Sequence, residues 1–189
     1  MKSFEERLLE ALTLRMERKG KLSLISFIPF SLLFIWVLLL FLTPLTENPH
    51  TIYLGNQGKV NMMDNTPYIK MHIHNEIARF VYLSGDFMCH QHADRSLFIN
   101  GNQMPYCARC TGIFLGLTLG ALIGALFRVK ISFSLYILSI LPLGIDGTVQ
   151  LLTSYTSSNL MRMITGSLTG AFTSLVFWYV YYDSLSSQK

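Results

Sequence analysis

Four long apolar stretches dominate the pattern of hydrophobic and polar residues along this chain. Residues 22–42 run for twenty-one positions without a charge and are rich in Leu, Ile and Phe. At about 1.5 Å of rise per residue, a helix of that length crosses the roughly 30 Å hydrocarbon layer of a bilayer. Further apolar stretches cover residues 111–127, 131–152 and 160–182. The pattern predicts an all-α, polytopic membrane protein with four transmembrane helices, the first at 22–43 and the others within 111–182.

The composition favours a membrane protein over a soluble helical one. Hydrophobic residues make up 51% of the chain and charged residues 14%, which is unusual for a soluble domain. A soluble protein with buried core helices is the alternative, but the length of the uncharged first segment argues against it. A cleavable signal peptide would have a shorter apolar core and a small-residue cleavage site, so we expect this helix to be retained.

Basic residues predict the orientation of the helices, because short loops rich in Lys and Arg stay in the cytoplasm. Six basic residues precede the first helix, and Arg128 and Lys130 lie in the short turn between the second and third helices. We therefore expect a multi-pass protein of the cell membrane with both termini in the cytoplasm, including the tail 183–189, and with the loop 44–110 outside. The net charge of +4 follows from this topology and needs no nucleic-acid partner.

The segments outside the spanning helices have weaker patterns. Residues 1–21 alternate apolar and charged positions, which predicts a cytoplasmic interfacial helix, with a solvated basic tail as the alternative. Residues 46–67 are rich in Asn, Gly and Pro and should be irregular or form a short hairpin. Apolar residues recur at helical spacing over 68–87, which predicts one amphipathic helix on the outer surface. The dipeptide Asn100-Gly101 predicts the tight turn of a hairpin over 95–105.

Glycine recurs at four-residue intervals in the second predicted helix, and a shorter version of the pattern occurs in the fourth. The positions are Gly112, Gly116, Gly120 and Gly124, and then Gly166 and Gly170. Such stripes of small residues let another helix approach closely in lipid. We expect the two stripes to pack together or against protein partners.

All three cysteines lie between residues 89 and 110. The stretch opens with Cys89-His90-Gln91-His92 and, after fourteen residues, closes with Cys107-Ala108-Arg109-Cys110. Three thiolates and one imidazole are the ligands of a tetrahedral zinc site, and other transition metals also bind such sets. Since the hairpin would bring the two ends together, the sequence predicts a metal site that staples the external loop. The spacing favours His92 as the fourth ligand, which leaves His90 for a supporting or catalytic role.

Other interpretations of these residues stay open. Thiols oxidise outside the cytoplasm, so a disulfide is one alternative, and a Cys-x-x-Cys pair at the mouth of a helix bundle also fits a quinone-linked thiol oxidoreductase. Unpaired structural thiols are another.

The beginning of the second helix, with Arg109 beside it, would lower the pKa of the thiols of Cys107 and Cys110. His72 and His74 would either extend the metal site or be solvated.

Three polar residues in the third and fourth helices are candidates for catalysis. Asp146 and Gln150 share a face at the outer end of the third helix, and Arg162 lies at the outer beginning of the fourth. Because polar groups are costly in lipid, we expect them to face the bundle interior or the water interface. They would then lie close to the cysteine loop. The structural alternative is an ion pair between Asp146 and Arg162 that ties the two helices together.

These motifs together resemble a family of prokaryotic membrane proteins known as domain of unknown function 2085. The similar positions extend over roughly residues 87–170 and are Cys89-His90-Gln91, Arg95-Ser96, Gly101, Pro105-x-Cys107-Ala108-Arg109-Cys110-Thr111-Gly112, Gly116, Asp146-Gly147-x-x-Gln150 and Ser158-Asn159-x-x-Arg162-x-x-Thr165-Gly166. The resemblance implies a small polytopic membrane protein with these polar positions, and no biochemical activity comes with it. His90 belongs to the family pattern, whereas His92 does not, which weighs against the choice of His92 from spacing.

Three functions are compatible with the sequence. The first is a membrane-surface enzyme or small-molecule binding site, in which a metal, zinc above all, acts with Asp146, Gln150 and Arg162. The second is an accessory subunit of a larger membrane complex such as a metal-dependent oxidase, with the metal locking the outer loop. The third is quinone-linked thiol oxidation. The sequence alone leaves open whether the chain is an enzyme.

Overall fold

The computed structural model describes residues 12–19 and 24–186 of the chain. It divides into two compact units. The first, here the helical unit, comprises Met1–Leu33, Gly112–Ser157 and Thr165–Lys189, as far as these residues are described. The second, here the loop unit, comprises Phe34–Thr111 and Ser158–Ile164.

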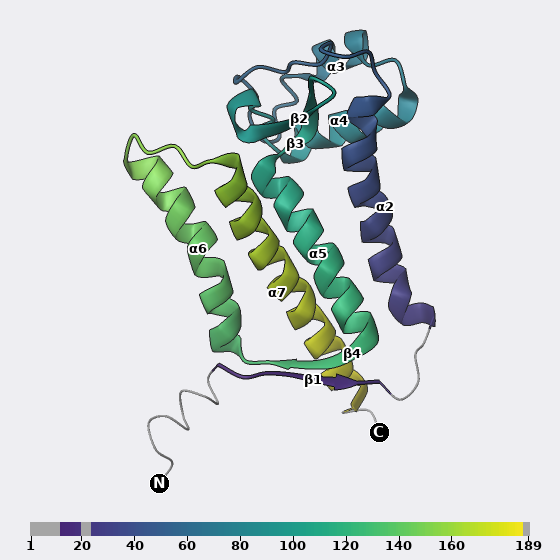
Figure 1. Cartoon of the computed structure of the whole chain (residues 1–189), viewed down its shortest axis with the longest axis vertical. Helices are drawn as coiled ribbons and strands as arrows, with labels where there is room; N and C mark the ends of the chain where they lie inside the picture. The colour runs from purple at the N-terminus through teal and green to yellow at the C-terminus, as the bar shows by residue number, and fades with distance from the viewer. Residues whose placement is uncertain (1–11, 20–23, 187–189) are drawn as a thin grey trace. The chain divides into compact units, whose positions relative to one another are not determined.

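Four helices are long and apolar enough to cross a membrane, which confirms the predicted fold class. They are α2 (Ile28–Leu42) with the 3-10 turns η1 (Leu24–Phe27) and η2 (Thr43–Leu45), α5 (Ala108–Leu126), α6 (Phe133–Leu152) and α7 (Asn159–Ser186) (Figure 1). They overlap the four apolar stretches of the sequence, but Phe127 and Ile131 lie in a strand, and α7 extends to Ser186. Long uncharged segments form helices in lipid because every backbone polar group must be satisfied within the segment.

The glycines of α5 and α7 bring the two helix backbones into direct contact. A Cβ atom on Gly116 would lie 2.0 Å from the carbonyl oxygen of Ser167, and one on Gly120 would lie 2.5 Å from that of Ala171. On the opposite side of the contact, a Cβ on Gly170 would lie 2.2 Å from the carbonyl oxygen of Ile113. The prediction that the two stripes pack together is therefore confirmed, and only a residue without a side chain fits these positions.

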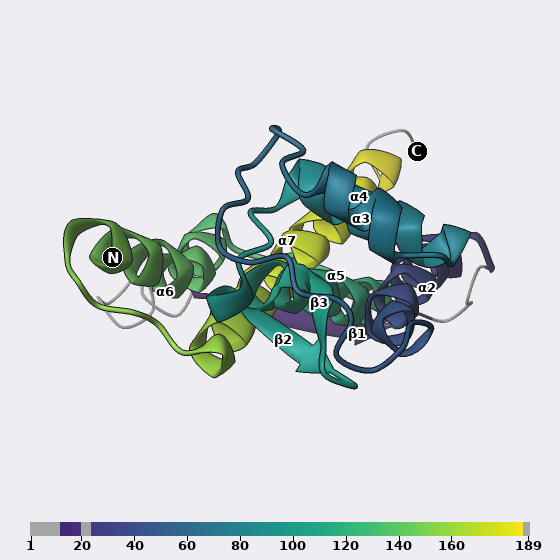
Figure 2. The same ribbon diagram turned by 90° about the horizontal axis from the view of Figure 1, so that it is seen from above.

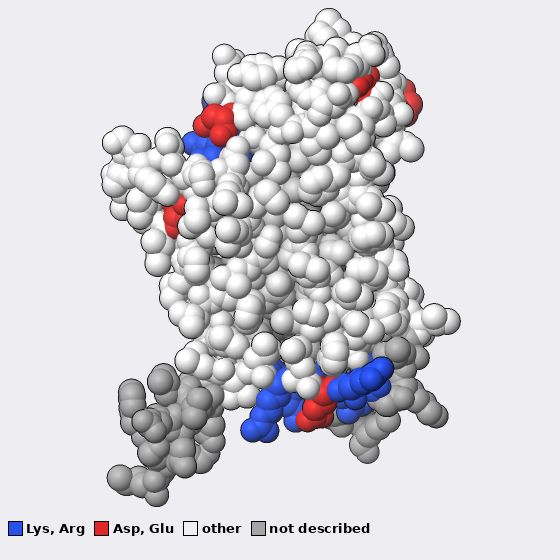
Figure 3. Space-filling model, in the orientation of Figure 1, with Lys and Arg blue, Asp and Glu red and all other residues white. Residues whose placement is uncertain are grey.

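A two-stranded antiparallel ribbon in the helical unit corrects the prediction for residues 1–21. Strand β1 (Leu14–Arg18) pairs with β4 (Phe127–Ile131), so the predicted interfacial helix is wrong at 14–18, and residues 1–11 and 20–21 lie outside the described residues. Arg128 and Lys130 are thus part of a strand and not of a simple turn. The partner strand lies more than a hundred residues away, so a local pattern of apolar and charged residues cannot reveal it. Basic side chains gather over this ribbon (Figure 3).

The loop unit contains two short helices where the sequence predicts one. Helix α3 (Thr66–His72) ends where Ile73 turns to an extended conformation, and α4 (Glu76–Met88) begins after Asn75. The Asn75 side chain accepts hydrogen bonds from the backbone N–H groups of Ile77 and Ala78, both at 3.0 Å. This N-cap starts a new helix and overrides the continuous apolar spacing. The two helices lie side by side (Figure 2).

The remaining elements of the loop unit are a 3-10 turn and a hairpin. Turn η3 (Ala93–Arg95) leads into β2 (Ser96–Ile99), which pairs with β3 (Asn102–Cys107). The predicted hairpin is therefore confirmed, and residues 46–65 are irregular as expected. A small apolar core lies between the irregular segment and the two helices. It consists of Ile52, Leu54, Ile69, Ile73, Ala78 and Tyr82.

Candidate metal centre

Three thiols converge in the loop unit. Cys89 directly follows α4, Cys107 ends β3, and Cys110 lies in the first turn of α5. Their sulfur atoms all lie within 4.8 Å of one another, and all three cysteines are free thiols. Cys89 is buried, whereas Cys107 and Cys110 are half-buried. The sequence prediction that both ends of the motif meet is therefore confirmed for the cysteines.

The tight turn of the hairpin returns Cys107 to Cys89. Asn100 and Gly101 both have a positive φ, 55° and 73°, as a two-residue hairpin turn of this kind requires. A Cβ on Gly101 would also lie 2.2 Å from a ring nitrogen of His50, so a side chain has no space there. The backbone N–H of Cys107 donates to the sulfur of Cys89 at 3.4 Å.

Buried amide side chains hold the segments that carry the cysteines. The amide of Gln91 donates to the carbonyl oxygens of Tyr82 at 2.9 Å and Pro105 at 2.8 Å, so it joins α4 to β3. Gln103 in turn donates to the carbonyl oxygen of Gln91 at 2.6 Å. Gln91 belongs to the sequence motif but has no role assigned from the sequence, and Gln103 is not part of any motif, because a glutamine in a polar loop looks solvated until the fold buries it. The positive φ of Gln91, 49°, is equally invisible in the sequence.

The thiols of Cys107 and Cys89 differ in pKa. Hydrogen bonds from the thiols of Cys110 and Cys89 hold the pKa of Cys107 well below its ordinary value. The hydrogen bond that Cys89 makes with Cys107 raises the pKa of Cys89 above its ordinary value, and burial adds to the effect. The predicted lowering is thus confirmed for Cys107, but the neighbouring thiols are its main cause. A metal ion can bind to the thiolate of Cys107, and the two neighbouring thiols then release their protons as they become ligands.

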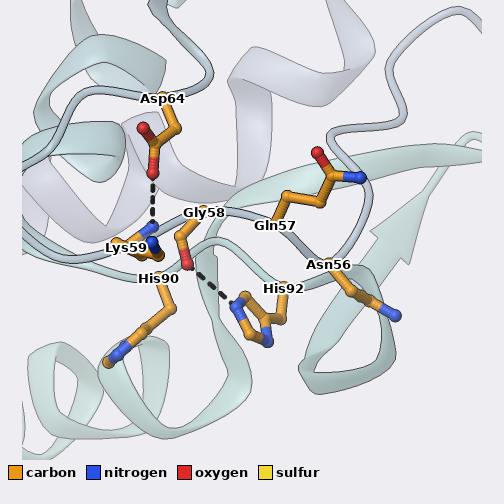
Figure 4. Close-up of a pocket in the computed structure, with 7 residues that line it drawn as sticks. All are labelled: Asn56, Gln57, Gly58, Lys59, Asp64, His90 and His92. Carbon is orange, nitrogen blue, oxygen red and sulfur yellow. Dashed lines mark hydrogen bonds between the residues drawn. The ribbon is translucent and has the colours of Figure 1, made fainter.

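The two predicted histidine ligands do not belong to the group of three close sulfur atoms. His90 and His92 line a pocket of about 710 Å³ together with Asn56, Gln57, Gly58, Lys59 and Asp64 (Figure 4). Their ring centroids lie 5.6 Å apart, and Nε2 of His92 lies 2.9 Å from the carbonyl oxygen of Gly58. His72 and His74 are exposed and are also outside the group of ligand atoms. Of the five predicted ligands, the structure therefore brings together the three cysteines but not His90 or His92.

Glycine at position 58 allows the pocket loop to approach the cysteine segment. A Cβ on Gly58 would lie 2.2 Å from the carbonyl oxygen of His90. The backbone N–H of Ala93 also donates to the carbonyl oxygen of Gly55 at 2.8 Å. The irregular segment is therefore held against residues 90–93, next to Cys89.

Arg162 lies at the beginning of α7 and is 4% exposed. Its guanidinium donates to the side-chain oxygen of Asn159 at 3.0 Å and, over 3.5 Å, to the carbonyl oxygen of Asp94. The amide of Asn159 donates to the carbonyl oxygen of Ser96 at 3.0 Å. These contacts fasten the first turn of α7 to the segment between the two ends of the cysteine motif.

Asp146 and Gln150 lie on α6 in the helical unit and contact each other. The amide of Gln150 donates to the Asp146 carboxylate at 2.7 Å and to its backbone carbonyl oxygen at 2.9 Å. This is the expected neighbour contact of residues four apart on a helix. A catalytic role for the three polar residues, and an ion pair between Asp146 and Arg162, stay predictions.

Comparisons with known proteins agree with the sequence motifs. The model of a family described as predicted membrane protein, domain of unknown function 2085, matches residues 89–176, which include all three cysteines and Arg162. An uncharacterized protein of Methanocaldococcus jannaschii is 36% identical over 95 residues, which are 48% of this chain and 61% of that protein. An uncharacterized protein of Methanothermobacter thermautotrophicus is 36% identical over 87 residues, which are 44% of this chain and 78% of that protein.

The extent of these similarities differs between the relatives. The match spans less than two thirds of the Methanocaldococcus protein but more than two thirds of the Methanothermobacter protein. No solved structure matches the chain at a significant level.

Proposed function

This chain belongs to the family of predicted membrane proteins known as domain of unknown function 2085. For this membrane protein we propose that the loop unit carries a metal site at the membrane surface. In the proposed site, Cys89, Cys107 and Cys110 bind one thiophilic ion, with zinc as the first choice. The site binds a small molecule or acts on it as an enzyme. The single observation that carries the proposal is the approach of all three sulfur atoms to within 4.8 Å.

The spacing of the sulfur atoms supports a shared ion. Two thiolates bound to one zinc ion at about 2.3 Å each lie at most about 4.6 Å apart, and closer in a tetrahedral site. In a tetrahedral site the two sulfur atoms lie about 3.8 Å apart, so a contraction of about 1 Å brings the three sulfur atoms into that range. The thiolate character of Cys107 also suits a metal ligand, because zinc binds the deprotonated sulfur.

The fourth coordination position decides what the site does. Either His90 or His92 fills it after a side-chain rotation, or it holds water or a substrate. A closed site is structural, whereas an open one polarises the bound molecule. We propose the open form, since neither imidazole lies within the group of close ligand atoms. The adjacent pocket with its two imidazoles would admit a small polar molecule.

The proposed topology places the loop unit outside the cytoplasm and both termini inside. The basic residues of β1 and β4 support it, because they flank the ends of spanning helices, where the positive-inside rule expects them. The role of accessory subunit has less support. The glycines of α5 and α7 contact each other within this chain, so they give no separate reason to expect a partner helix.

Elemental analysis of protein purified in mild detergent tests metal binding. We expect about one zinc per chain in the wild type and strong loss of zinc in Cys89→Ser, Cys107→Ser and Cys110→Ser. Met88→Leu is the matched control, because it removes a sulfur next to Cys89 that is not a proposed ligand. Wild-type protein that folds and holds no thiophilic metal would rule the proposal out.

Cobalt substitution tests the fourth position. Absorption of the bound cobalt reports its coordination, and an added small ligand such as azide should change the spectrum of an open site. In a closed site, His90→Ala or His92→Ala would change the spectrum and His72→Ala would not. An azide-insensitive spectrum that shifts with one histidine variant would make the site structural.

Thiol labelling separates the metal site from the redox alternative. In that alternative, Cys107 and Cys110 cycle between dithiol and disulfide and pass two protons and two electrons to a quinone. The approach of two thiols of one Cys-x-x-Cys pair favours it as a second candidate. Maleimide labelling that depends on quinone, in protein without bound metal, would support the redox function and contradict the metal site.

A further inference from the structure

The ribbon of β1 and β4 lies at the level where two spanning helices leave the bilayer. Strand β4 begins directly after Leu126, the last residue of α5, and Ser132 follows it as the N-cap of α6. Ser132 accepts a hydrogen bond from the N–H of Leu135 at 3.3 Å, which fixes the start of α6. Because both helices are candidate spans, the six residues between them, 127–132, must lie near the membrane–water interface.

Aromatic residues at the end of α7 mark the same level. Trp178 and Tyr182 stack with ring centroids 5.4 Å apart, and Tyr181 contacts both rings. Trp and Tyr are enriched at the membrane–water interface, because one part of each ring system is apolar and the other can form hydrogen bonds. Lys19 lies over both stacked rings, 5.1 Å from the centroid of Trp178 and 4.4 Å from that of Tyr182.

Lys19 fastens the ribbon to the helix ends. Its ammonium group donates to the carbonyl oxygens of Gly124 at 2.9 Å and Ala125 at 2.7 Å, and to the hydroxyl of Tyr182. A cation in this position also compensates the negative end of the α5 dipole. Burial, with Arg128 nearby, lowers the pKa of Lys19. The ribbon is thus held in a defined position, and the other basic residues are presented on it.

The register of the ribbon places three cations and one carboxylate on one face. Arg15 lies opposite Lys130, and Glu17 lies opposite Arg128. Directly opposite residues of antiparallel strands point to the same face, so these four side chains share it, and all four are exposed. Figure 3 shows basic side chains gathered here next to acidic atoms, and Glu17 is the acidic residue of the two strands. We call this surface, formed by Arg15, Glu17, Arg128 and Lys130, the basic face.

The pairing of Arg15 with Lys130 is unfavourable by itself. Like charges directly opposite each other in two strands are destabilising. Neither residue has an ion pair with another residue in the part of the chain that the structure describes. An anion bound between them would turn the repulsion into attraction.

We propose that the basic face binds the phosphate groups of anionic phospholipids. The lipid phosphates lie at the level of the ribbon, because the spanning helices end there. Guanidinium groups bind phosphate oxygens with two parallel hydrogen bonds, and Arg15 and Arg128 each supply one such group. The site does not depend on the metal centre and lies in the other unit.

Lipid retention in native mass spectrometry tests the proposal on the full chain in detergent. We expect the wild type to retain phosphatidylglycerol in preference to phosphatidylcholine. Arg15→Gln with Lys130→Gln should reduce the retention of phosphatidylglycerol by about fivefold for each charge removed. The control Lys70→Gln with Arg95→Gln removes the same charge from the loop unit and should leave retention unchanged.

A second variant keeps the test decisive if the double variant fails to fold. Glu17→Gln removes the only acidic side chain of the two strands and should raise the retention of phosphatidylglycerol by a few fold. Equal retention of both lipids by the wild type would overturn the proposal, and so would Glu17→Gln without an increase. Thermal unfolding of the wild type with each ligand separates the two sources of phosphate. If inorganic phosphate raises the unfolding temperature as much as phosphatidylglycerol does, the face binds the free anion and the lipid proposal fails.

Discussion

The loop unit and the helical unit are stabilised by different kinds of contact. In the loop unit, buried amides and a small apolar core hold irregular backbone in place. The side chain of Asn102, for example, accepts hydrogen bonds from the N–H groups of Thr51 and Ile52 at 2.9 Å and donates hydrogen bonds to the carbonyl oxygens of Pro44 and Asn48. In the helical unit, α5 and α7 instead pack backbone against backbone through glycine.

The difference follows from the surroundings of the contacts, because the turn-rich residues 46–107 of the loop unit lie outside the candidate spans, whereas α5 and α7 pack within two of them. Lipid supplies no hydrophobic driving force between helices, so close packing of small residues takes its place. The loop unit contains many turns, and its buried backbone groups need side-chain partners because neighbouring strands are short. Small polar units of this kind commonly depend on a metal or a disulfide for stability. The two units should therefore respond to different perturbations.

Removal of the proposed metal should have the largest effect, and it should be confined to the loop unit. Apparent binding free energies of structural zinc reach about 10 kcal/mol or more, part of which becomes folding free energy. We expect chelation or Cys107→Ser to speed the proteolysis of residues 46–107, while α5 and α7 resist cleavage. Peptide mapping after limited proteolysis measures this, with Met88→Leu as the control. Equal protection of the loop with and without metal would contradict the expectation.

Asn102→Ala should have the next largest effect and should also act on the loop unit. The side chain is fully buried and makes four hydrogen bonds to backbone groups. Buried groups that lose a partner cost about 1–3 kcal/mol each, so the loop should lose several kcal/mol. Hydrogen exchange of Thr51 and Ile52 would report the loss. Gln57→Ala removes an exposed amide and should change little; similar exchange in both variants would contradict the role of Asn102.

Gly116→Ala should affect the helical unit and leave the loop unit intact. The new Cβ would lie 2.0 Å from the carbonyl oxygen of Ser167, so α5 and α7 must move apart. Overpacking of this kind costs about 1–3 kcal/mol. Unfolding in mixed detergent micelles measures the loss, and the metal content should stay at the wild-type level. Gly144→Ala on α6 is the matched control, because nothing lies within 4 Å of its Cβ. Equal stability of both variants would contradict the close contact.

Asn75→Ala should have the smallest effect of the four, because it removes only the N-cap of α4. Loss of such a cap costs about 1 kcal/mol. Asn75→Asp keeps an acceptor for the N–H groups of Ile77 and Ala78 and should retain the stability. Thermal unfolding followed by circular dichroism compares the two variants. A destabilised Asn75→Asp would show that the cap is not the cause.

Much of the fold follows from local patterns in the sequence. The four spanning helices depend on long uncharged segments, and the hairpin depends on two adjacent residues, Asn100 and Gly101, that adopt positive φ readily. The spacing of the cysteines and the hairpin between them were enough to predict that Cys89 meets Cys107 and Cys110. In each case the physical cause lies within a short stretch of chain.

Other features depend on contacts between distant residues, and only the tertiary structure decided them. Residues 14–18 have an alternating pattern that is compatible with a helix, but pairing with 127–131 makes them a strand. The burial of Gln91 and Gln103, and the separation of His90 and His92 from the close sulfur atoms, also depend on where the backbone folds back. A single sequence shows which groups can bond but not which of them the fold brings within reach.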